Sequence, residues 1–322
     1  MNHSFATCEL SAPLHIDFEI TGRCQLDCSY CSAAPLGQPD VPTDRAIALL
    51  AEMHRIGVFS LLMSGGEPTL HRDFVKIAAA ASRSVRALVV NTNGIRFSRE
   101  KLCAEFADAA PNALVAISLD SADSAASNSS RGTGAELAMK AIANCSALGL
   151  PVCISAVLTE KTFSNAAELV DRFAPKVNLF RFFPRVPRDE NDLLLNNSAY
   201  IKSLNDFYAC LRTLAINNPA VEVLTPSGNA RNWEAEGEKK TATECVCSTT
   251  RLYIDRKLDV YPCYYSAHPD NLIGSCEYRS LEELWKTEKA RSIREKSARK
   301  RLCGASPGPT TIPIRYQQHI RN

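Results

Sequence analysis

Six short apolar segments alternate with amphipathic segments between His15 and Pro184, and this alternation limits the possible folds more than any other feature of the chain. In the amphipathic segments, apolar residues recur every three or four positions, as in a helix that buries one face. Strands that alternate with helices form parallel sheets, because each helix returns the chain to the starting edge of the next strand. The predicted strands are His15–Thr21, Ser60–Ser64, Ala87–Asn91, Leu114–Asp120, Val152–Leu158 and Leu179–Phe183, and the predicted helices cover residues 43–56, 73–83, 98–109, 134–148 and 165–174. The sequence therefore predicts an α/β fold built on a partial (β/α)6 barrel of the TIM type.

Polar and glycine-rich residues follow several of the predicted strands. In a barrel of this kind the carboxyl ends of all strands meet at one mouth, which carries the active site. We therefore expect these residues to line a single site. They are residues 21–31, 64–68 and 91–94, Asp120 with the Ser- and Asn-rich loop 121–134, and Arg181 and Arg185.

Three cysteines follow the first predicted strand with the spacing Cys-x3-Cys-x2-Cys: Cys24, Cys28 and Cys31. Three thiolates on one loop can hold three irons of a cubane [4Fe–4S] cluster and leave the fourth iron open to a ligand. A structural zinc site would need a fourth Cys or His, and none lies near the triplet. Coincidence in a cysteine-rich chain is the third interpretation. The spacing alone leaves all three open.

The composition excludes several classes of protein. The chain has 322 residues and a formal net charge of +2, so its electrostatics give no reason to expect nucleic acid as a partner. The longest apolar run, Leu150–Leu158, is too short to cross a membrane, and no signal peptide is evident. Thirteen cysteines is an odd count in a chain too large to need disulfides. We therefore expect a reducing cytoplasm, with some cysteines serving as metal ligands.

The run Gly65-Gly66-Glu67-Pro68 follows the second predicted strand. Glycines there allow a ligand to approach the backbone closely, and a carboxylate can hold an ammonium group. An ordinary turn would use the same residues, so the run alone is a weak signal. Together with the preceding cysteine loop and the β/α units, it resembles the radical SAM superfamily of S-adenosylmethionine (SAM) enzymes. The resemblance covers residues 14–190.

The resemblance implies roles for named residues. Tyr30 would lie against the adenine, Glu67 would receive the methionine amino group, and Arg131 would pair with the methionine carboxylate. The residues implied in SAM binding are Tyr30, Gly65, Gly66, Glu67, Asn93, Ser118, Asp120 and Arg131, and those implied as ligands of the SAM-binding [4Fe–4S] cluster are Cys24, Cys28 and Cys31. Each polar residue could instead be an ordinary strand-end or turn residue. In this family an electron, which a flavodoxin- or ferredoxin-type donor would supply, cleaves SAM to a 5′-deoxyadenosyl radical that abstracts hydrogen from an unactivated carbon.

The pattern changes beyond Pro187. The sequence predicts a helix over 198–217, a short strand over 221–224, a flexible linker or lid over 226–244, and a hairpin of Arg251–Ile254 and Leu258–Tyr261. A capping box, Ser280-Leu-Glu-Glu283, starts a last helix that ends near Cys303. We expect three regions: a barrel (1–190), a helical connector with the linker (191–244), and a carboxyl-terminal region (245–322) that contains the hairpin.

The carboxyl-terminal region resembles the SPASM/twitch extension of radical SAM enzymes, which holds auxiliary iron–sulfur clusters. Two departures matter: Leu258 stands where the family has a glycine, and the dense second-cluster cysteine array is absent. The resemblance thus implies one auxiliary [4Fe–4S] cluster, with Cys245, Cys247, Cys263 and Cys303 as its ligands. The first two are so close in sequence that one of them is a doubtful ligand. Cys276 is either a plain buried cysteine or a donor that returns a hydrogen atom to a substrate radical.

Two catalytic functions and two other functions follow from these features. The enzyme would act on a ribosomally made peptide, by epimerisation or crosslinking, or on a small natural product, by dehydrogenation or epimerisation. Only 23 residues precede Cys24, which leaves no room there for the leader-binding domain of many peptide-modifying relatives. A non-catalytic iron–sulfur carrier or scaffold would not cleave SAM. A molybdenum-cofactor-type cyclase fits less well, because the chain lacks that family's terminal paired glycines.

Overall fold

A computed structural model describes residues 10–31, 39–158, 163–177, 179–184, 198–225, 228–229 and 249–299. Its strands are β1 His15–Glu19, β2 Ser60–Ser64, β3 Ala87–Thr92, β4 Leu114–Ser118, β5 Val152–Leu158, β6 Leu179–Pro184, β7 Glu222–Thr225, β8 Gly228–Asn229, β9 Arg251–Ile254, β10 Asp259–Tyr261 and β11 Gly274–Ser275. Its α-helices are α1 Thr43–Ile56, α2 Phe74–Ser84, α3 Glu100–Ala109, α4 Ser124–Arg131, α5 Ala135–Ala147, α6 Asn165–Phe173, α7 Ser198–Asn217, α8 Leu281–Trp285 and α9 Glu288–Arg299.

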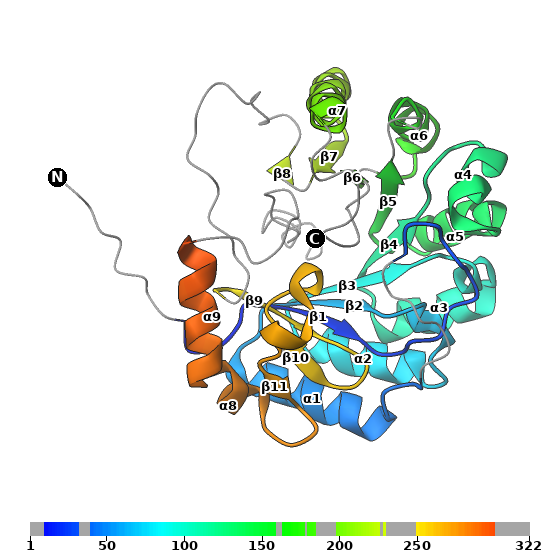
Figure 1. Ribbon diagram of the computed structural model, residues 1–322. Helices are drawn as coiled ribbons and strands as arrows, with labels where there is room; N and C mark the ends of the chain where they lie inside the picture. The colour runs from blue at the N-terminus through cyan, green and yellow to red at the C-terminus, as the bar shows by residue number, and fades with distance from the viewer. Residues whose placement is uncertain are drawn as a thin grey trace.

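The described strands form one sheet in the order β11-β10-β9-β1-β2-β3-β4-β5-β6-β7-β8. Strands β1 to β7 pair with one another in parallel, β8 pairs with β7 antiparallel, and Figure 1 shows the parallel strands following an arc with helices α1, α2, α3 and α5 on its outer side. The predicted (β/α)6 barrel is therefore confirmed, and its strand boundaries differ from the prediction by two residues at most. No described helix is both long enough and apolar enough to cross a lipid bilayer.

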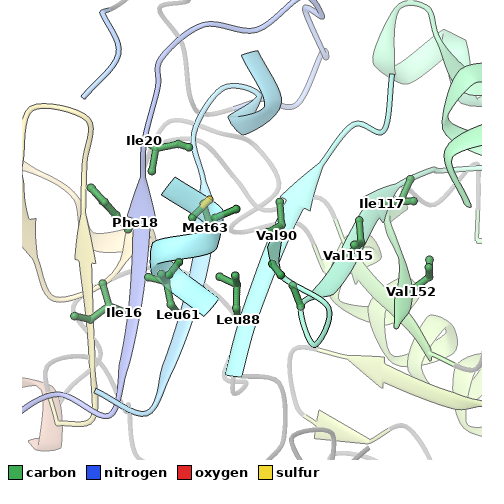
Figure 2. Packing of buried hydrophobic residues seen from close by; sticks show 14 of the residues in the cluster. Ile16, Phe18, Ile20, Leu61, Met63, Leu88, Val90, Val115, Ile117 and Val152 are labelled. Carbon is green, nitrogen blue, oxygen red and sulfur yellow. The ribbon is translucent and has the colours of Figure 1, made fainter. Parts of the chain in front are cut away.

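The two faces of the sheet differ because side chains alternate along each strand. Ile16 and Phe18 of β1 pack on the helix side, the outer face, with Leu61 and Met63 of β2 (Figure 2). Each side chain of this kind contributes about 1.5–3 kcal/mol when it is fully buried. The residues between them point to the opposite, inner face. On β1 this inner set is polar and buried: His15, Asp17 and Glu19.

The hairpin of β9 and β10 extends the barrel sheet, which the sequence did not indicate. Strand β9 pairs in parallel with β1, so that His15 lies opposite Arg251, and β10 then pairs with β9 antiparallel. Leu258 precedes β10 with a φ of 65°, in the left-handed region that glycine enters freely. The departure from the family's glycine thus falls on the position that requires this backbone conformation. Burial of the Leu258 side chain offsets part of the strain.

Two local predictions were wrong. The loop expected over 121–134 contains α4, whose Ser-rich sequence has little intrinsic preference for helix but whose first turn is capped by Asp123, which accepts from the Ala126 amide at 2.7 Å. The single helix expected after Ser280 is two helices, α8 and α9, and the second begins where Thr287 accepts from the Ala290 amide at 3.1 Å. The capping box at Ser280 is confirmed. Arg185, Cys303 and nearly all of the predicted linker 226–244 lie outside the described residues, as do the region boundaries expected after 190 and 244.

Candidate functional site

Two loops meet in direct backbone contact at the carboxyl ends of β1 and β2. The amide of Gly66 donates to the carbonyl of Thr21 at 2.8 Å, and the amide of Glu67 donates to the carbonyl of Arg23 at 2.7 Å. A Cβ on Gly65 would lie 2.3 Å from the Thr21 oxygen, and one on Gly66 would lie 2.4 Å from the Arg23 oxygen. These glycines therefore allow the cysteine loop to approach closely. The sequence suggested instead that they make room for a ligand.

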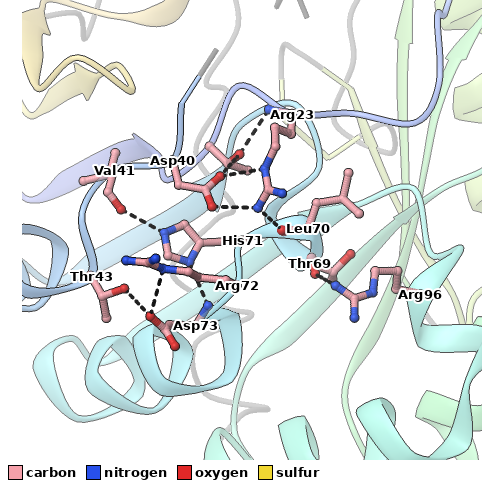
Figure 3. A network of polar contacts seen from close by, with 11 residues as sticks. Arg23, Asp40, Val41, Thr43, Thr69, Leu70, His71, Arg72, Asp73 and Arg96 are labelled. Carbon is pink, nitrogen blue, oxygen red and sulfur yellow. Dashed lines mark hydrogen bonds and ion pairs between the residues drawn. The ribbon is translucent and has the colours of Figure 1, made fainter. Parts of the chain in front are cut away.

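An ion pair joins the two ends of the segment that carries the cysteines (Figure 3). Arg23 donates to Asp40 through Nε at 2.9 Å and through Nη2 at 2.6 Å, and Thr21 Oγ1 donates to the same carboxylate at 2.6 Å. Burial raises the pKa of Asp40, but these hydrogen bonds outweigh it and hold the pKa below its usual range. Arg23 also donates to the carbonyl of Leu70 in the loop after β2. These contacts fix the base of the cysteine loop against its neighbour.

The three cysteines of the loop are half-buried. Cys24 Sγ faces two N–H donors, the Leu26 amide at 3.4 Å and Asn93 Nδ2 at 4.0 Å. Burial raises the pKa of Cys28 to about 11, although Arg131 opposes this shift. Coordination to a metal would remove the proton from such a thiol. Three thiols on one loop with N–H donors at a sulfur suit an iron–sulfur cluster, whose potential depends on such hydrogen bonds.

The described residues contain no group of three or more Cys, His, Asp or Glu side chains arranged around a single metal ion. A structural zinc site needs four such ligands drawn together in a tetrahedron, and the described residues show no such set.

Asp120 connects the cysteine loop to the end of α4. Its carboxylate accepts from Tyr30 Oη and from Ser130 Oγ at 2.7 Å, and its Oδ2 lies 3.0 Å from Arg131 Nε. Its other oxygen, Oδ1, accepts from the Val157 amide at 3.0 Å. The Arg131 guanidinium lies over the Tyr30 ring, 5.5 Å from its centre. The structure thus brings three of the predicted SAM-binding residues into one contact group beside Cys28.

Glu67 is fully enclosed by the protein, with 1% of its surface exposed. Its Oε1 accepts from Thr69 Oγ1 at 2.5 Å and Thr92 Oγ1 at 2.7 Å, and its Oε2 accepts from the Asn93 amide at 2.7 Å. Burial raises the pKa of this carboxyl group, and the hydrogen bonds oppose that shift. Glu67 therefore orders the ends of β2 and β3. Its predicted contact with the methionine amino group stays a prediction.

A row of inner-face residues lies beside this site. Ser118 at the end of β4, Ser155 on β5 and Arg181 on β6 are register partners, so they share one level of the sheet. Ser118 is the only one of the three that the resemblance assigned to SAM. Arg181, which the sequence placed at the mouth, is 8% exposed.

The two described cysteines of the carboxyl-terminal region, Cys263 and Cys276, lie in different parts of the structure. Cys263 is buried just after β10, at the end of the hairpin where β9 begins, and its Sγ lies 3.4 Å from Ser266 Oγ. Its predicted partner ligands, Cys245, Cys247 and Cys303, lie outside the described residues. Cys276 follows β11 and packs against the outer-face core beside α1, where Arg45 donates to its carbonyl at 3.0 Å. The structure does not bring Cys276 to the cysteine loop.

Sequence reasoning missed the residues that hold this site together. Asp40 pairs with Arg23 across 17 positions, and no periodicity or motif connects the two. Thr92 was a detectable case, because it lies inside the Asn-Thr-Asn-Gly run that contains Asn93. Thr69, next to the Gly-Gly-Glu-Pro run, carried no separate signal.

Two regions of the chain match known protein families. Residues 18–173 match the radical SAM superfamily, and residues 245–305 match SPASM, an iron–sulfur cluster-binding domain. The chain is 26% identical to the mycofactocin maturase MftC of Mycobacterium tuberculosis (strain ATCC 25618 / H37Rv) over 300 residues, covering 89% of this chain and 74% of MftC. It is also 26% identical to the AdoMet-dependent heme synthase of Methanosarcina barkeri (strain Fusaro / DSM 804) over 319 residues, covering 91% of this chain and 88% of the synthase. Streptococcus suis SuiB bound to S-adenosylmethionine has a similar fold, with a TM-score of 0.74 at 18% identity, covering 88% of this chain and 68% of SuiB.

Proposed function

This chain belongs to the radical SAM superfamily and carries a SPASM-type iron–sulfur region, and we propose that it modifies a ribosomally made precursor peptide by abstracting hydrogen from an unactivated carbon. One observation carries the proposal. The cysteine loop, the loop after β2 and the Asp120 contact group hold one another at the edge of the sheet where a β/α barrel has its active site.

The family membership implies SAM and a [4Fe–4S] cluster as cofactors, and the SPASM region implies auxiliary iron–sulfur binding. When bound, the reduced cluster and SAM supply a carbon radical that can take hydrogen from an unactivated carbon. We propose that Cys24, Cys28 and Cys31 ligate the SAM-binding cluster. One auxiliary cluster would be held by Cys263 together with Cys245, Cys247 and Cys303.

The residues around the cysteine loop would bind and orient SAM. Asp120 would hold the Arg131 guanidinium in place through its contact with Nε. The other N–H groups of the guanidinium could then donate to the methionine carboxylate. Tyr30, fixed by its hydrogen bond to Asp120, offers its ring to the adenine. Ser118, at the adjacent strand end, is half-buried and faces the inner side. Together these side chains would exclude water and set the position from which hydrogen is taken.

A peptide substrate is supported by two relatives. MftC is a mycofactocin maturase, and SuiB has been crystallised bound to its precursor peptide SuiA. The outcome of the reaction, whether epimerisation, dehydrogenation or crosslinking, would depend on how the substrate radical is quenched. A flavodoxin- or ferredoxin-type donor in a reducing cytoplasm belongs to the same proposal, because the cluster must be reduced before SAM is cleaved.

A small-molecule substrate is the second candidate. The heme synthase of Methanosarcina barkeri is as similar in sequence as MftC and matches over a larger share of its own length. A small substrate would need no extended binding surface. Incubation with precursor-peptide candidates encoded near the gene, and separately with a porphyrin substrate, distinguishes the two by product mass.

Anaerobic reconstitution followed by dithionite and SAM tests the class of reaction. We expect 5′-deoxyadenosine from the native chain and none above background when Cys24, Cys28 or Cys31 is replaced by Ala. Cys210, which is exposed on α7, supplies the matched control, and Cys210→Ala should keep full turnover. An iron content of about eight atoms per chain supports one auxiliary cluster, and about four excludes it. Failure of the native, fully loaded chain to form deoxyadenosine would refute the proposed function.

A further inference from the structure

Arg181 is a buried cation that the proposed function does not use. It lies on the inner face of β6 and is 8% exposed. Its register partner on β5 is Ser155, and the next residue along that row is Ser118 of β4. Neighbouring strands are about 4.8 Å apart, so the Arg181 and Ser118 positions are separated by roughly 10 Å. The residue therefore lies beside the site proposed for SAM.

The contacts of Arg181 are with neutral groups. Its Nη2 donates to Ser155 Oγ at 3.2 Å and to Asn91 Oδ1 at 3.4 Å, and its guanidinium lies over the Phe183 ring, 5.2 Å from the ring centre. Its Nε is buried and has no hydrogen-bond partner among the described residues, a feature that it shares with Arg131, Arg251 and Arg256. Within the described part of the chain, no carboxylate lies within 4 Å of this guanidinium.

Arg251 and Arg256 differ from Arg181 in that each lies next to a carboxylate. Arg251 pairs with Asp17 at 3.3 Å, and Arg256 pairs with Glu19 at 3.1 Å. Arg181 is close enough to lower the pKa of Asp17, but less than Arg251 does, and Asp17 is already committed to Arg251. Asp255 of the hairpin turn is a further carboxylate on this side, close enough to raise the pKa of Glu19, so the difference lies in direct contacts rather than in a count of charges. Among the described residues, Arg181 is the one of these three guanidinium groups without a carboxylate within 4 Å.

A buried charge without a counter-ion is costly unless a ligand supplies one. A guanidinium is planar and presents its N–H groups as a fork, which matches the two oxygens of a carboxylate. Asn91 and Ser155 hold one side of that fork and leave Nε unused. We propose that Arg181 is the receptor for a carboxylate of the substrate, with Asn91 and Ser155 as its positioning residues.

This inference rests on the proposed peptide-modifying function and adds a specificity to it. The carboxylate would belong to an acidic side chain or to the carboxyl terminus of the peptide. Either would anchor the substrate so that the carbons next to the carboxylate lie between Arg181 and the SAM site. The residue modified would then be the acidic or terminal residue itself or its immediate neighbour.

Binding of short probe peptides to the reconstituted, SAM-saturated enzyme tests the inference. The probes are acetyl-Gly-Glu-Gly-amide, acetyl-Gly-Gly with a terminal carboxylate, and acetyl-Gly-Gln-Gly-amide as the neutral isostere. The measurement is the melting temperature in a buffer without carboxylates. A probe present at about ten times its Kd should raise the melting temperature by about 2–4 °C. We expect a rise with at least one carboxylate probe, which identifies the source, and none with the neutral isostere.

Two substitutions make the test specific. Arg181→Gln should abolish the rise, and it should not lower the melting temperature of the ligand-free protein, because it removes an unpaired charge. Arg181→Lys keeps the charge without the fork and should retain part of the rise. Arg86→Gln removes one exposed positive charge and should leave the rise intact. The affinity for SAM should be unchanged in all three variants.

Four results would overturn the inference. They are an equal rise with the neutral isostere, a full rise in Arg181→Gln, no rise with any probe up to about 50 mM, and a tenfold loss of SAM affinity in Arg181→Gln. The last would assign Arg181 to the methionine carboxylate. No reductant is added, so the result does not depend on SAM cleavage. Failure of the proposed function would appear separately, as absence of deoxyadenosine with an intact binding response.

Discussion

The two faces of the central sheet are formed by the same strands but are stabilised in different ways. On the outer face, Phe18 and its neighbours are excluded from water by the helices, and any well-fitting apolar side chain would serve there. On the inner face, Asp17 is just as buried but requires particular partners, His15 at 2.7 Å and Arg251 at 3.3 Å. A buried ion pair adds little net stability compared with apolar packing. Among the described residues of the sheet, this buried ion pair lies on the inner face, which also carries a smaller apolar cluster that includes Val89, Leu114 and Leu179.

Replacing Asp120 should have the largest effect, because this residue pairs with buried Arg131 and, in the proposed function, also positions the residues that would bind SAM. Asp120→Asn removes the charge that Arg131 and Tyr30 depend on and leaves the Arg131 guanidinium buried without its counter-ion. We expect a loss of about 3–5 kcal/mol in the free energy of unfolding. We also expect deoxyadenosine formation to fall by about two orders of magnitude, since the loss of one such interaction typically has this effect.

The control for Asp120 lies three residues away. Asp123 is exposed and caps α4, and Asn caps a helix equally well. Asp123→Asn should therefore leave both the unfolding midpoint and deoxyadenosine formation unchanged. Equal losses in the two variants would mean that Asp120 acts only through the stability of α4.

One substitution on each face compares the two kinds of stabilisation directly. Phe18→Ala should cost about 3–5 kcal/mol through lost packing and a cavity. Arg251→Met should cost a similar amount, because it removes the cationic partner of the buried Asp17 carboxylate and leaves it, among the described residues, with the His15 hydrogen bond alone. The midpoints of urea unfolding, measured for the loaded enzyme, should therefore shift by comparable amounts.

A second substitution separates the two causes. Asp17→Asn combined with Arg251→Met removes both charges, and we expect stability to return to within about 1–2 kcal/mol of the native chain. Removing a charge should not restore the stability of Phe18→Ala in this way, because that variant has lost packing rather than a counter-ion. If the double variant is as unstable as Arg251→Met alone, Arg251 stabilises the fold by packing, and the contrast between the faces is weaker than the contacts suggest.

The outer face was the part of the molecule that the sequence predicted well. Alternating apolar residues and helical periodicity located six strands and their helices to within two residues, because burial is a local property of each segment. Helix α4 was missed, since a cap and tertiary contacts stabilise it against its own composition. The addition of β9 beside β1 was also missed, because strand pairing between residues 15 and 251 has no signature in either segment.

The candidate site was only partly predictable. The cysteine loop, Glu67 and Asp120 could be found because their motifs are short and continuous in the sequence. The Arg23–Asp40 ion pair and the unpaired charge of Arg181 could not, since both depend on which residues the fold brings together. Glu67 shows a further limit: its motif was detected, but only the structure revealed that its carboxylate is occupied by Thr69, Thr92 and the Asn93 amide.

Replacing Cys276 should have the smallest effect on stability and activity. This residue tests whether the outer face takes no part in the reaction. Paired residues on adjacent strands point to the same face of a sheet. Phe18 pairs with Ile254, Ile254 with Val260, and Val260 with Gly274. Gly274 is two residues before Cys276, so Cys276 also belongs to the helix side of the sheet. Burial raises the pKa of its thiol to about 12. The group therefore stays protonated at neutral pH, and its thiolate becomes abundant only as the pH rises towards that value.

We expect Cys276→Ala to lower the unfolding free energy by about 1 kcal/mol and to leave product formation and deoxyadenosine formation coupled as in the native chain. In the native protein, iodoacetamide should label Cys210 well before Cys276 at pH 8, because the second thiol is buried and protonated. A variant that cleaves SAM normally but accumulates an unquenched or abortive product would identify Cys276 as the hydrogen donor. The thiol would then have to reach the inner side, and the separation of the two faces would not hold during turnover.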